Sequence, residues 1–356
     1  MTLELKNVVK RVGAETHIHE TSLTLATEGF NVLLGATGAG KTTLIKLMAG
    51  LEQPTSGEIW FNGENVTGRS TQRRNVALVH QFFINYENMT VFGNIASPLR
   101  VARLDRREIE RRVGETAELL KLTELLGRRP SELSGGQQQR TALARAIVKD
   151  TGLVLLDEPL ANLDYKLREE LRDQLPQLFA DRGAIVVYAT SEPSEALLLG
   201  GHTATMSEGR VTQFGVTPVS YRQPRDLETA EVFSDPPINL APVAKRGERI
   251  ILNDAVQWPA TGAIAAAPDG DYTVGVRPHY VTPDRVAEHA VRLNGRVLLT
   301  ELSGSESMAH FDLDGLTWVA QSHGVHPYEV GVRHDFYIDI EGCLYFEAGG
   351  RRVTAG

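Results

Sequence analysis

Long apolar runs are absent from this sequence of 356 residues, and cysteine is nearly absent. Cys343 is the single cysteine, which excludes a framework of internal disulfides and fits a reducing compartment. No stretch approaches the ~20 consecutive apolar residues that a membrane-spanning helix needs. Residues 1–6 lack the charged and then apolar pattern of a secretory signal. We therefore expect a cytoplasmic chain, in which any role at a membrane depends on partner proteins.

An excess of positive charge is also absent. The sequence has 37 Lys and Arg against 45 Asp and Glu, a formal net charge of -8. Proteins that bind nucleic acid usually present a basic patch. The arginines within residues 103–112 alternate with acidic residues, which is typical of a solvated helix face. The charge pattern thus argues against nucleic acid as a partner.

Short apolar runs do occur, and they have the continuous character of strands buried on both faces. They lie at residues 30–34, 76–79, 153–156 and 185–188. Helical patterns separate them, which predicts a parallel sheet with crossover helices. Alternating segments at 3–9 and 58–61 predict antiparallel strands.

The helical patterns predict two further features. The charged residues 101–127 indicate a helical subdomain within about residues 82–150. After Asp164 a helix keeps one face apolar, but Pro176 interrupts that face. Because proline lacks an N–H group and clashes with the preceding turn, we expect it to bend or end this helix.

The composition changes near residue 236. Short β-like segments separated by Gly, Asp and Pro follow it, at residues 273–276, 291–300, 308–313 and 336–340. Regular spacing of such segments predicts a small barrel or sandwich. We therefore expect an α/β domain over residues 1–235 and a small all-β domain over residues 236–356.

A glycine-rich loop follows the run at 30–34 and opens a helix that Gly50 ends. The residues expected to bind nucleotide here are Gly35, Ala36, Thr37, Gly38, Ala39, Gly40, Lys41, Thr42 and Thr43. In such a loop, backbone N–H groups surround phosphate oxygens at the start of a helix. Lys41 is placed to reach the β and γ phosphates, and the Thr42 hydroxyl to bind Mg²⁺. The alternative is an ordinary glycine-rich turn.

An acidic pair ends the apolar run at 153–156. Asp157 is expected to hold Mg²⁺, and Glu158 is the candidate general base that polarises the attacking water. The alternative for this pair is a strand end that faces solvent.

The sequence Leu-Ser-Gly-Gly-Gln at residues 133–137 follows the glycine-rich loop by about a hundred residues and precedes Asp157 by about twenty. Ser134 can cap the helix that follows, expected over residues 137–148. The three segments, in this order, resemble the nucleotide-binding subunit of ABC (ATP-binding cassette) proteins. The resemblance implies a P-loop ABC cassette with a mixed sheet, and a dimer in which this signature completes the ATP site of the second cassette. The signature residues are Ser134, Gly135, Gly136 and Gln137.

The same resemblance assigns two more segments. Gln81 resembles the glutamine that contacts Mg²⁺ and the attacking water, and the surface after it resembles the region that receives a membrane partner. That surface includes Phe82, Phe83, Tyr86 and Met89. Asn162, Leu163 and Asp164 resemble the loop that crosses the dimer interface.

The chain departs from the family pattern at two positions. Ser191 stands where the family usually has a histidine that contacts the γ-phosphate, and losing one such donor typically costs ~10² to 10³ in rate. Val12 stands where an aromatic residue commonly stacks on adenine, so it offers apolar contact without stacking.

The carboxy-terminal part also resembles this family, in its sugar-importer branch of the maltose and glycerol-phosphate type. Residues 206–224 resemble the end of those cassettes, 236–240 their linker, and 275–278 with 301–306 their regulatory domain, an oligonucleotide-fold-like (OB-like, or TOBE) barrel. The branch usually has Glu where this chain has His279. The resemblance implies dimer contact and regulation for this domain.

The resemblance implies an ATPase subunit, using ATP and Mg²⁺, that powers a bacterial importer of a carbohydrate, a polyol such as glycerol, or a glycerol-phosphate-like solute. Its expected partners are a second cassette, two membrane permease subunits and, indirectly, a solute-binding protein, at the cytoplasmic face of the inner membrane. Because of Ser191, we favour a heterodimer in which this chain keeps the slow site. The alternatives are a chiefly regulatory cassette with little hydrolysis of its own, and a non-transport ABC protein.

Overall fold

The computed structural model describes the chain except for residues 28, 83, 162, 181–182, 287–288 and 355–356. Its contacts divide the chain into two compact units, Met1–Arg222 and Gln223–Gly356. The sequence placed this boundary later, at residue 236. Residues 223–235 belong to the second unit because backbone bonds tie them to its end: the Leu227 N–H donates to the Gly350 carbonyl, and the Arg352 N–H donates to the Arg225 carbonyl.

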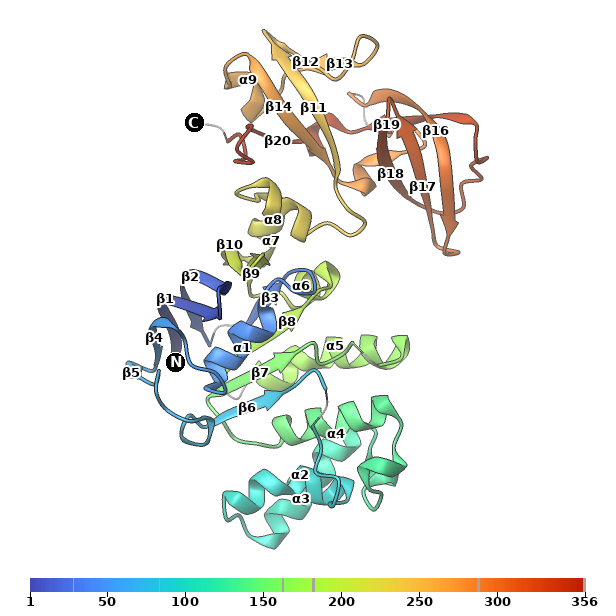
Figure 1. Cartoon of the computed structure of the whole chain (residues 1–356). Coiled ribbons are helices and arrows are strands. Elements are labelled where there is room, and N and C mark those ends of the chain that lie inside the picture. The colour runs from blue at the N-terminus through green and yellow to red at the C-terminus, as the bar shows by residue number, and fades with distance from the viewer. Residues whose placement is uncertain (28, 83, 162, 181–182, 287–288, 355–356) are drawn as a thin grey trace. The chain divides into compact units, whose positions relative to one another are not determined.

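A six-stranded sheet lies at the centre of the first unit (Figure 1). Its order is β10-β9-β3-β8-β7-β6, and every neighbouring pair is parallel except β10 with β9. The strands are β3 (Phe30–Leu34), β6 (Val76–Val79), β7 (Leu153–Asp157), β8 (Ile185–Thr190), β9 (His202–Ser207) and β10 (Arg210–Val216). Every residue of β3, β7 and β8 is buried, which explains the continuous apolar runs from which the sheet was predicted.

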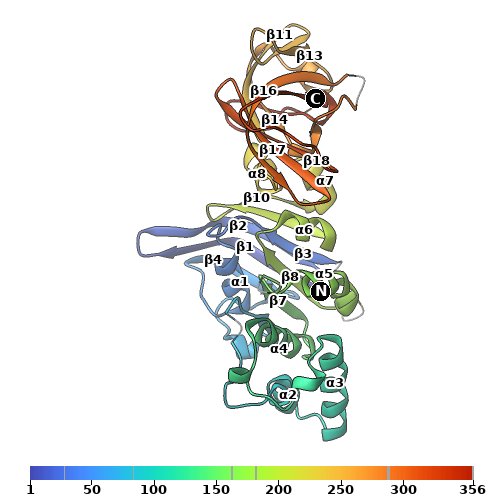
Figure 2. The same cartoon turned by 90° about the vertical axis from the view of Figure 1, so that its right-hand side faces the viewer.

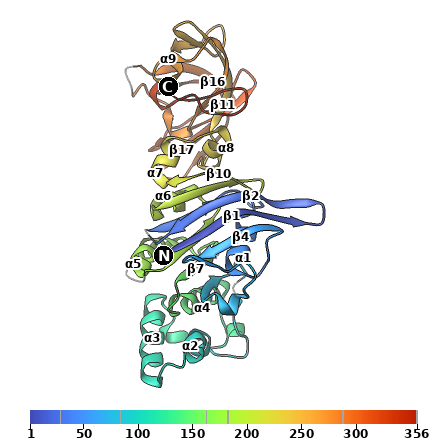
Figure 3. The same cartoon turned by 90° about the vertical axis from the view of Figure 1, so that its left-hand side faces the viewer.

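A second, antiparallel sheet of order β2-β1-β4-β5 covers helix α1 (Lys41–Ala49), as Figure 3 shows. Its strands are β1 (Thr2–Val12), β2 (Glu15–Ala26), β4 (Ser56–Phe61) and β5 (Glu64–Asn65). Buried residues of α1 share one apolar core with strands of both sheets. The helix ends where Gly50 takes a left-handed conformation with φ of 74°, as the sequence predicted.

Helices α2 (Val91–Val101), α3 (Arg106–Leu119) and α4 (Gly135–Ile147) pack against one another (Figure 2). Helix thus begins at Val91, ten residues before the predicted charged stretch. Helix α5 (Tyr165–Ala180) continues past Pro176, so of the two predicted effects of this proline, a bend or an end, the helix end does not occur. The remaining helices of this unit are α6 (Pro193–Leu199), α7 (Thr217–Arg222) and the 3-10 turns η1 (Thr71–Arg73), η2 (Thr123–Leu125) and η3 (Pro130–Glu132). Within the described residues, no helix combines the length and the apolar character that a bilayer span requires.

The second unit is a small, mostly β unit of two five-stranded antiparallel sheets, consistent with the predicted OB-like barrel. One sheet holds β11 (Asn239–Arg246), β12 (Arg249–Ile251), β13 (Gln257–Pro259), β14 (Gly270–Val276) and β20 (Leu344–Phe346). The other holds β15 (Val281–Thr282), β16 (Val291–Leu302), β17 (Glu306–Leu313), β18 (Leu316–His323) and β19 (Arg333–Ile338). The short helices are α8 (Leu227–Val232), α9 (Ala263–Ala266), η4 (Pro278–Tyr280) and η5 (Ile340–Gly342). Residues of both sheets share one core, in which the rings of Phe311 and Phe336 stack 4.1 Å apart.

Candidate functional site

The glycine-rich loop joins β3 to α1 and is held closely by neighbouring strands. The Gly35 N–H donates to the Thr190 carbonyl at the end of β8, at 3.3 Å. A Cβ at Gly35 would lie 2.4 Å from the Met206 carbonyl oxygen, and Gly40 has a φ of 101°. Both positions therefore require glycine. Around Gly38, whose φ is 88°, a Cβ would meet no atom within 4 Å, so the loop is open on that side.

Lys41 lies folded against this loop. Its Nζ donates to the carbonyl oxygens of Gly35 at 2.6 Å and Ala36 at 3.1 Å, and lies 3.5 Å from Glu158 Oε1. Burial lowers the pKa of Lys41, and the neighbouring Glu158 carboxylate opposes that shift. The site thus contains a buried cation whose present partners are carbonyls that a phosphate oxygen could replace.

Thr42 and Asp157 meet at the start of α1 and the end of β7. The Thr42 hydroxyl donates to Asp157 Oδ1 at 3.1 Å. Asp157 is 1% exposed, and its Oδ2 is buried with no hydrogen-bond partner. Burial raises the pKa of Asp157, while the Thr42 hydroxyl lowers it. An orphaned, buried carboxylate oxygen beside a hydroxyl fits an oxygen-binding cation such as Mg²⁺.

Glu158 and Gln81 form the next part of the site. Gln81 Nε2 donates to Glu158 Oε2 at 3.1 Å, although the two residues lie 77 positions apart. Glu158 has a φ of 46°, and its N–H donates to the Ala189 carbonyl of β8 at 3.0 Å. This backbone directs the Glu158 carboxylate toward both Lys41 and Gln81. The structure therefore brings together the predicted residues of the phosphate loop, Gln81, Asp157 and Glu158.

The two departures from the family pattern lie on different elements of the first unit. Ser191 is exposed and directly follows Thr190, whose carbonyl accepts from the loop. Val12 is 50% exposed and lies at the turn between β1 and β2, opposite Glu15.

The signature residues lie at the start of α4. Ser134 caps this helix, and Gln137 completes a capping box by accepting from the Ser134 N–H at 2.9 Å. The cap predicted from the sequence is therefore present. Ser134 and Gly135 are exposed, so the positive end of the helix faces solvent, where an anion could approach. Gly136 lies beside them in the first turn of the helix.

Two other predicted segments are only partly described. Asp164 Oδ1 accepts from the Leu167 N–H at 3.0 Å at the start of α5, whereas Asn162 lies outside the described residues. Phe82, Tyr86 and Met89 are 79%, 49% and 39% exposed, and Phe83 lies outside the described residues. The apolar surface after Gln81 is therefore present for the side chains that are described.

Sequence reasoning missed one residue beside the site and one that supports the helix carrying it. His80 precedes Gln81, and its electrostatic influence lowers the pKa of Asp157, whereas burial, the main effect, raises it. Arg74 is 5% exposed and supports α1 from its far end. Its guanidinium donates to the carbonyls of Leu47, Met48, Thr67 and Arg69 at 2.9 to 3.0 Å. Neither belongs to a motif, and only the folded chain shows which groups they reach.

Replacing Arg74 with alanine is expected to lower the free energy of unfolding of the first unit by about 3 kcal/mol, because the last carbonyls of α1 lose their buried donor. Arg73 is exposed, so Arg73→Ala is the matched control, with an expected change within about 0.5 kcal/mol. Urea unfolding of the full chain, followed by circular dichroism, measures both. Equal unfolding midpoints for the two variants would show that Arg74 does not support α1.

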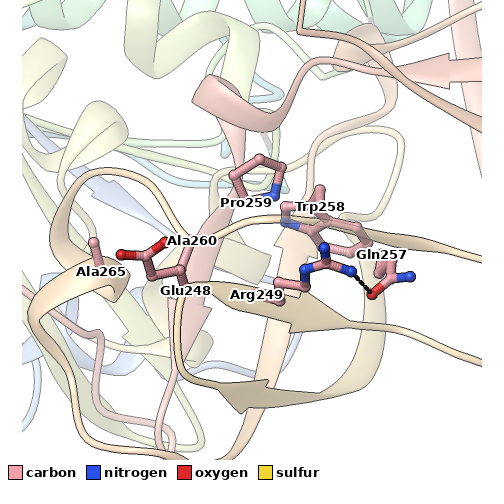
Figure 4. Close-up of a pocket in the computed structure, with 7 residues that line it drawn as sticks. All are labelled: Glu248, Arg249, Gln257, Trp258, Pro259, Ala260 and Ala265. Atoms are coloured by element: carbon pink, nitrogen blue, oxygen red, sulfur yellow. Dashed lines mark hydrogen bonds between the residues drawn. The ribbon is translucent and has the colours of Figure 1, made fainter.

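A pocket of about 570 Å³ in the second unit contains none of the predicted site residues (Figure 4). It is bordered by β12 and β13, where Arg249 donates to Gln257 Oε1 at 3.1 Å beside Trp258. Because this pocket holds no predicted site residue, the candidate site remains the cluster around the phosphate loop.

Comparisons with known proteins identify the family of this chain. A model of the ABC transporter family matches residues 18–161. The sn-glycerol-3-phosphate import ATP-binding protein UgpC of Chromohalobacter salexigens is 36% identical, over 99% of this chain and 96% of its own length. The trehalose/maltose import ATP-binding protein MalK of Thermococcus litoralis is 34% identical, over 97% of each chain.

A solved structure is also similar. It is the ATP-binding cassette MJ0796, solved as a dimer in a post-hydrolysis state with ADP and Pi. The match spans 60% of this chain and 98% of the MJ0796 chain, with 27% identity and a TM-score of 0.56. Together with the full-length relatives, it shows that the chain belongs to the ATP-binding proteins of the ABC transporter family.

Proposed function

We propose that the chain binds ATP and Mg²⁺ at the phosphate loop, Asp157 and Glu158, and hydrolyses ATP to drive the import of a solute. The observation that carries this proposal is the hydrogen bond of Thr42 to the buried Asp157, which has one orphaned carboxylate oxygen, beside Lys41 and Glu158. These are the groups needed to hold a metal–phosphate unit and to activate a water molecule in one place.

Each residue then has a chemical role. The loop and Lys41 bind the phosphates, and Lys41 exchanges its carbonyl partners for phosphate oxygens. Thr42, Asp157 and Gln81 would hold Mg²⁺, which would offset negative charge on the phosphates. Glu158 accepts the proton of the attacking water, and Gln81, 3.1 Å from its carboxylate, orients that water. Val12 provides apolar contact for the adenine ring of ATP.

The solute and the partners follow from the relatives. Proteins named for the import of sn-glycerol 3-phosphate and of trehalose or maltose align along nearly the whole chain. We therefore propose a carbohydrate, a polyol such as glycerol, or a glycerol-phosphate-like solute. Two permease subunits would hold the chain at the cytoplasmic face of the inner membrane, and the exposed surface of Phe82, Tyr86 and Met89 would contact them. A solute-binding protein would act indirectly.

The cassette partner is proposed to be a different chain that carries the switch histidine. Ser191 favours this pairing, because a short, neutral side chain replaces a γ-phosphate donor in this chain's own site. The signature at Ser134 to Gln137 is complete and would serve the site of the partner cassette, with Asp164 at the interface. A chiefly regulatory role, with little hydrolysis at this chain's own site, rests on the same observation.

The importer function is tested in cells that lack this chain. Uptake of radiolabelled glycerol, glycerol 3-phosphate, maltose and xylose is measured with and without the restored gene, and with Ser134→Arg. Loss of uptake of one of these solutes, restored by the original chain and not by Ser134→Arg, is expected. Unchanged uptake of all four would contradict the proposed solute class.

A further inference from the structure

Ser191 is exposed, but the backbone on both sides of it is held by side chains that no motif includes. On the buried side, Glu195 in α6 accepts from the hydroxyls of Tyr188 at 2.9 Å and Thr190 at 2.6 Å. The Thr190 oxygen in turn accepts from the Glu192 N–H at 3.0 Å. Tyr188, Thr190 and Glu195 are each at most 4% exposed, so this side of the segment is anchored in the interior.

On the other side, Arg168 of α5 joins two loops. Its Nη1 donates to Glu192 Oε1 at 2.7 Å, and its Nη2 donates to the Ala161 carbonyl at 3.1 Å. Ala161 belongs to the loop that follows Glu158, and Glu192 is the neighbour of Ser191. A planar guanidinium can hold two acceptors in a fixed geometry, which the single ammonium group of lysine cannot do.

We propose that Arg168 is a positioning residue for ATP hydrolysis, which ties the loop after Glu158 to the segment that carries Ser191, so that the two move together. This inference rests on the proposed function, in which the partner cassette packs against the loop around Asp164. Closure of the two cassettes would then shift Ser191 as well, through Ala161, Arg168 and Glu192. The side chains of Arg168 and Glu192 are 24% and 41% exposed, and ion pairs at such exposure add little to stability. A purely structural role would therefore be a small one.

Hydrogen–deuterium exchange of the purified full chain without nucleotide tests the link itself. Arg168→Ala is expected to raise exchange at least about threefold both at residues 160–161 and at residues 189–192. Arg172→Ala is the matched control, because Arg172 lies one turn further along α5 and pairs with Glu169 of its own helix. The control should change neither segment. Unchanged exchange at residues 189–192 in Arg168→Ala would overturn the proposal.

ATP turnover in the assembled transporter tests the consequence. In a transporter whose partner cassette carries an inactivating substitution of its own general base, Arg168→Ala and Glu192→Ala are each expected to lower kcat about tenfold with KM for ATP within twofold. The double variant should be no slower than either single variant, because both remove the same link. Arg168→Lys should resemble Arg168→Ala. Independent, multiplying losses in the double variant would overturn the coupling. If the original chain supports no ATPase activity in the transporter, the proposed function fails, whereas the exchange result still decides whether the link exists.

Discussion

Replacing Ser134 with arginine is expected to remove nearly all ATPase activity of the assembled transporter, about 100-fold, whereas Glu158→Gln is expected to lower it less than about twofold. The first substitution puts a long cation at the exposed start of α4, where the proposed γ-phosphate of the partner's site would lie. The second removes the general base of a site that already lacks the switch histidine. If the partner's site hydrolyses most of the ATP, the signature of this chain contributes more to the total ATPase rate than its own general base, Glu158, does.

This ranking is measured with the chain purified together with the cassette and permeases that accompany it. Asp105→Arg is the matched control, because Asp105 caps α3 as Ser134 caps α4, accepting from the Glu108 N–H at 3.0 Å. Loss of such a cap costs about 1 kcal/mol, too little to unfold the chain, so the control should retain activity. A Glu158→Gln variant that is inactive while Ser134→Arg works, or a fully active dimer of this chain alone, would contradict the pairing.

Much of the site could be predicted because its residues follow local rules. The loop glycines, Lys41 and Thr42 lie in one short segment, and Asp157 ends a strand whose apolar run is visible in the sequence. The Ser134 cap and the left-handed Gly50 also depend only on neighbours in the chain. In these places local geometry and the folded structure require the same residue types.

The remaining contacts depend on distant parts of the chain. Arg74 reaches the end of α1 from 26 and 27 residues away, and Arg168 reaches Glu192 across 24 positions. A charged residue in a helix usually faces solvent, so its pattern does not reveal such a partner. In helix α5, by contrast, a local signal in the sequence is outweighed by packing in the folded chain. Pro176 is a local signal for a helix end, yet buried Leu171 and Leu175 before it and Phe179 after it keep the apolar face continuous, and packing outweighs the lost hydrogen bond.

Replacing Ser191 with histidine is expected to raise hydrolysis at this chain's own site about 100-fold, which is the usual contribution of one preorganised donor to a transition state. The backbone before position 191 is already held against the phosphate loop and Glu158. The Thr190 carbonyl accepts from the Gly35 N–H of the phosphate loop, and the Ala189 carbonyl accepts from the Glu158 N–H, so position 191 is fixed relative to both. Because Ser191 is exposed, the larger ring should fit with a stability change within about 0.5 kcal/mol.

The increase in hydrolysis at this chain's own site can be measured only when the partner's site does not hydrolyse ATP. Turnover is therefore measured in a transporter whose partner cassette carries an inactivating substitution of its own general base. Ser191→Ala should leave the slow rate unchanged, and Ser191→His combined with Glu158→Gln should show no gain, because a donor to the phosphate cannot replace the base that activates water. A gain that survives the loss of Glu158 would mean that the histidine acts as a base itself. No gain in Ser191→His alone would mean that the serine does not limit this site, and the argument for an unequal pair of cassettes would lose its main support.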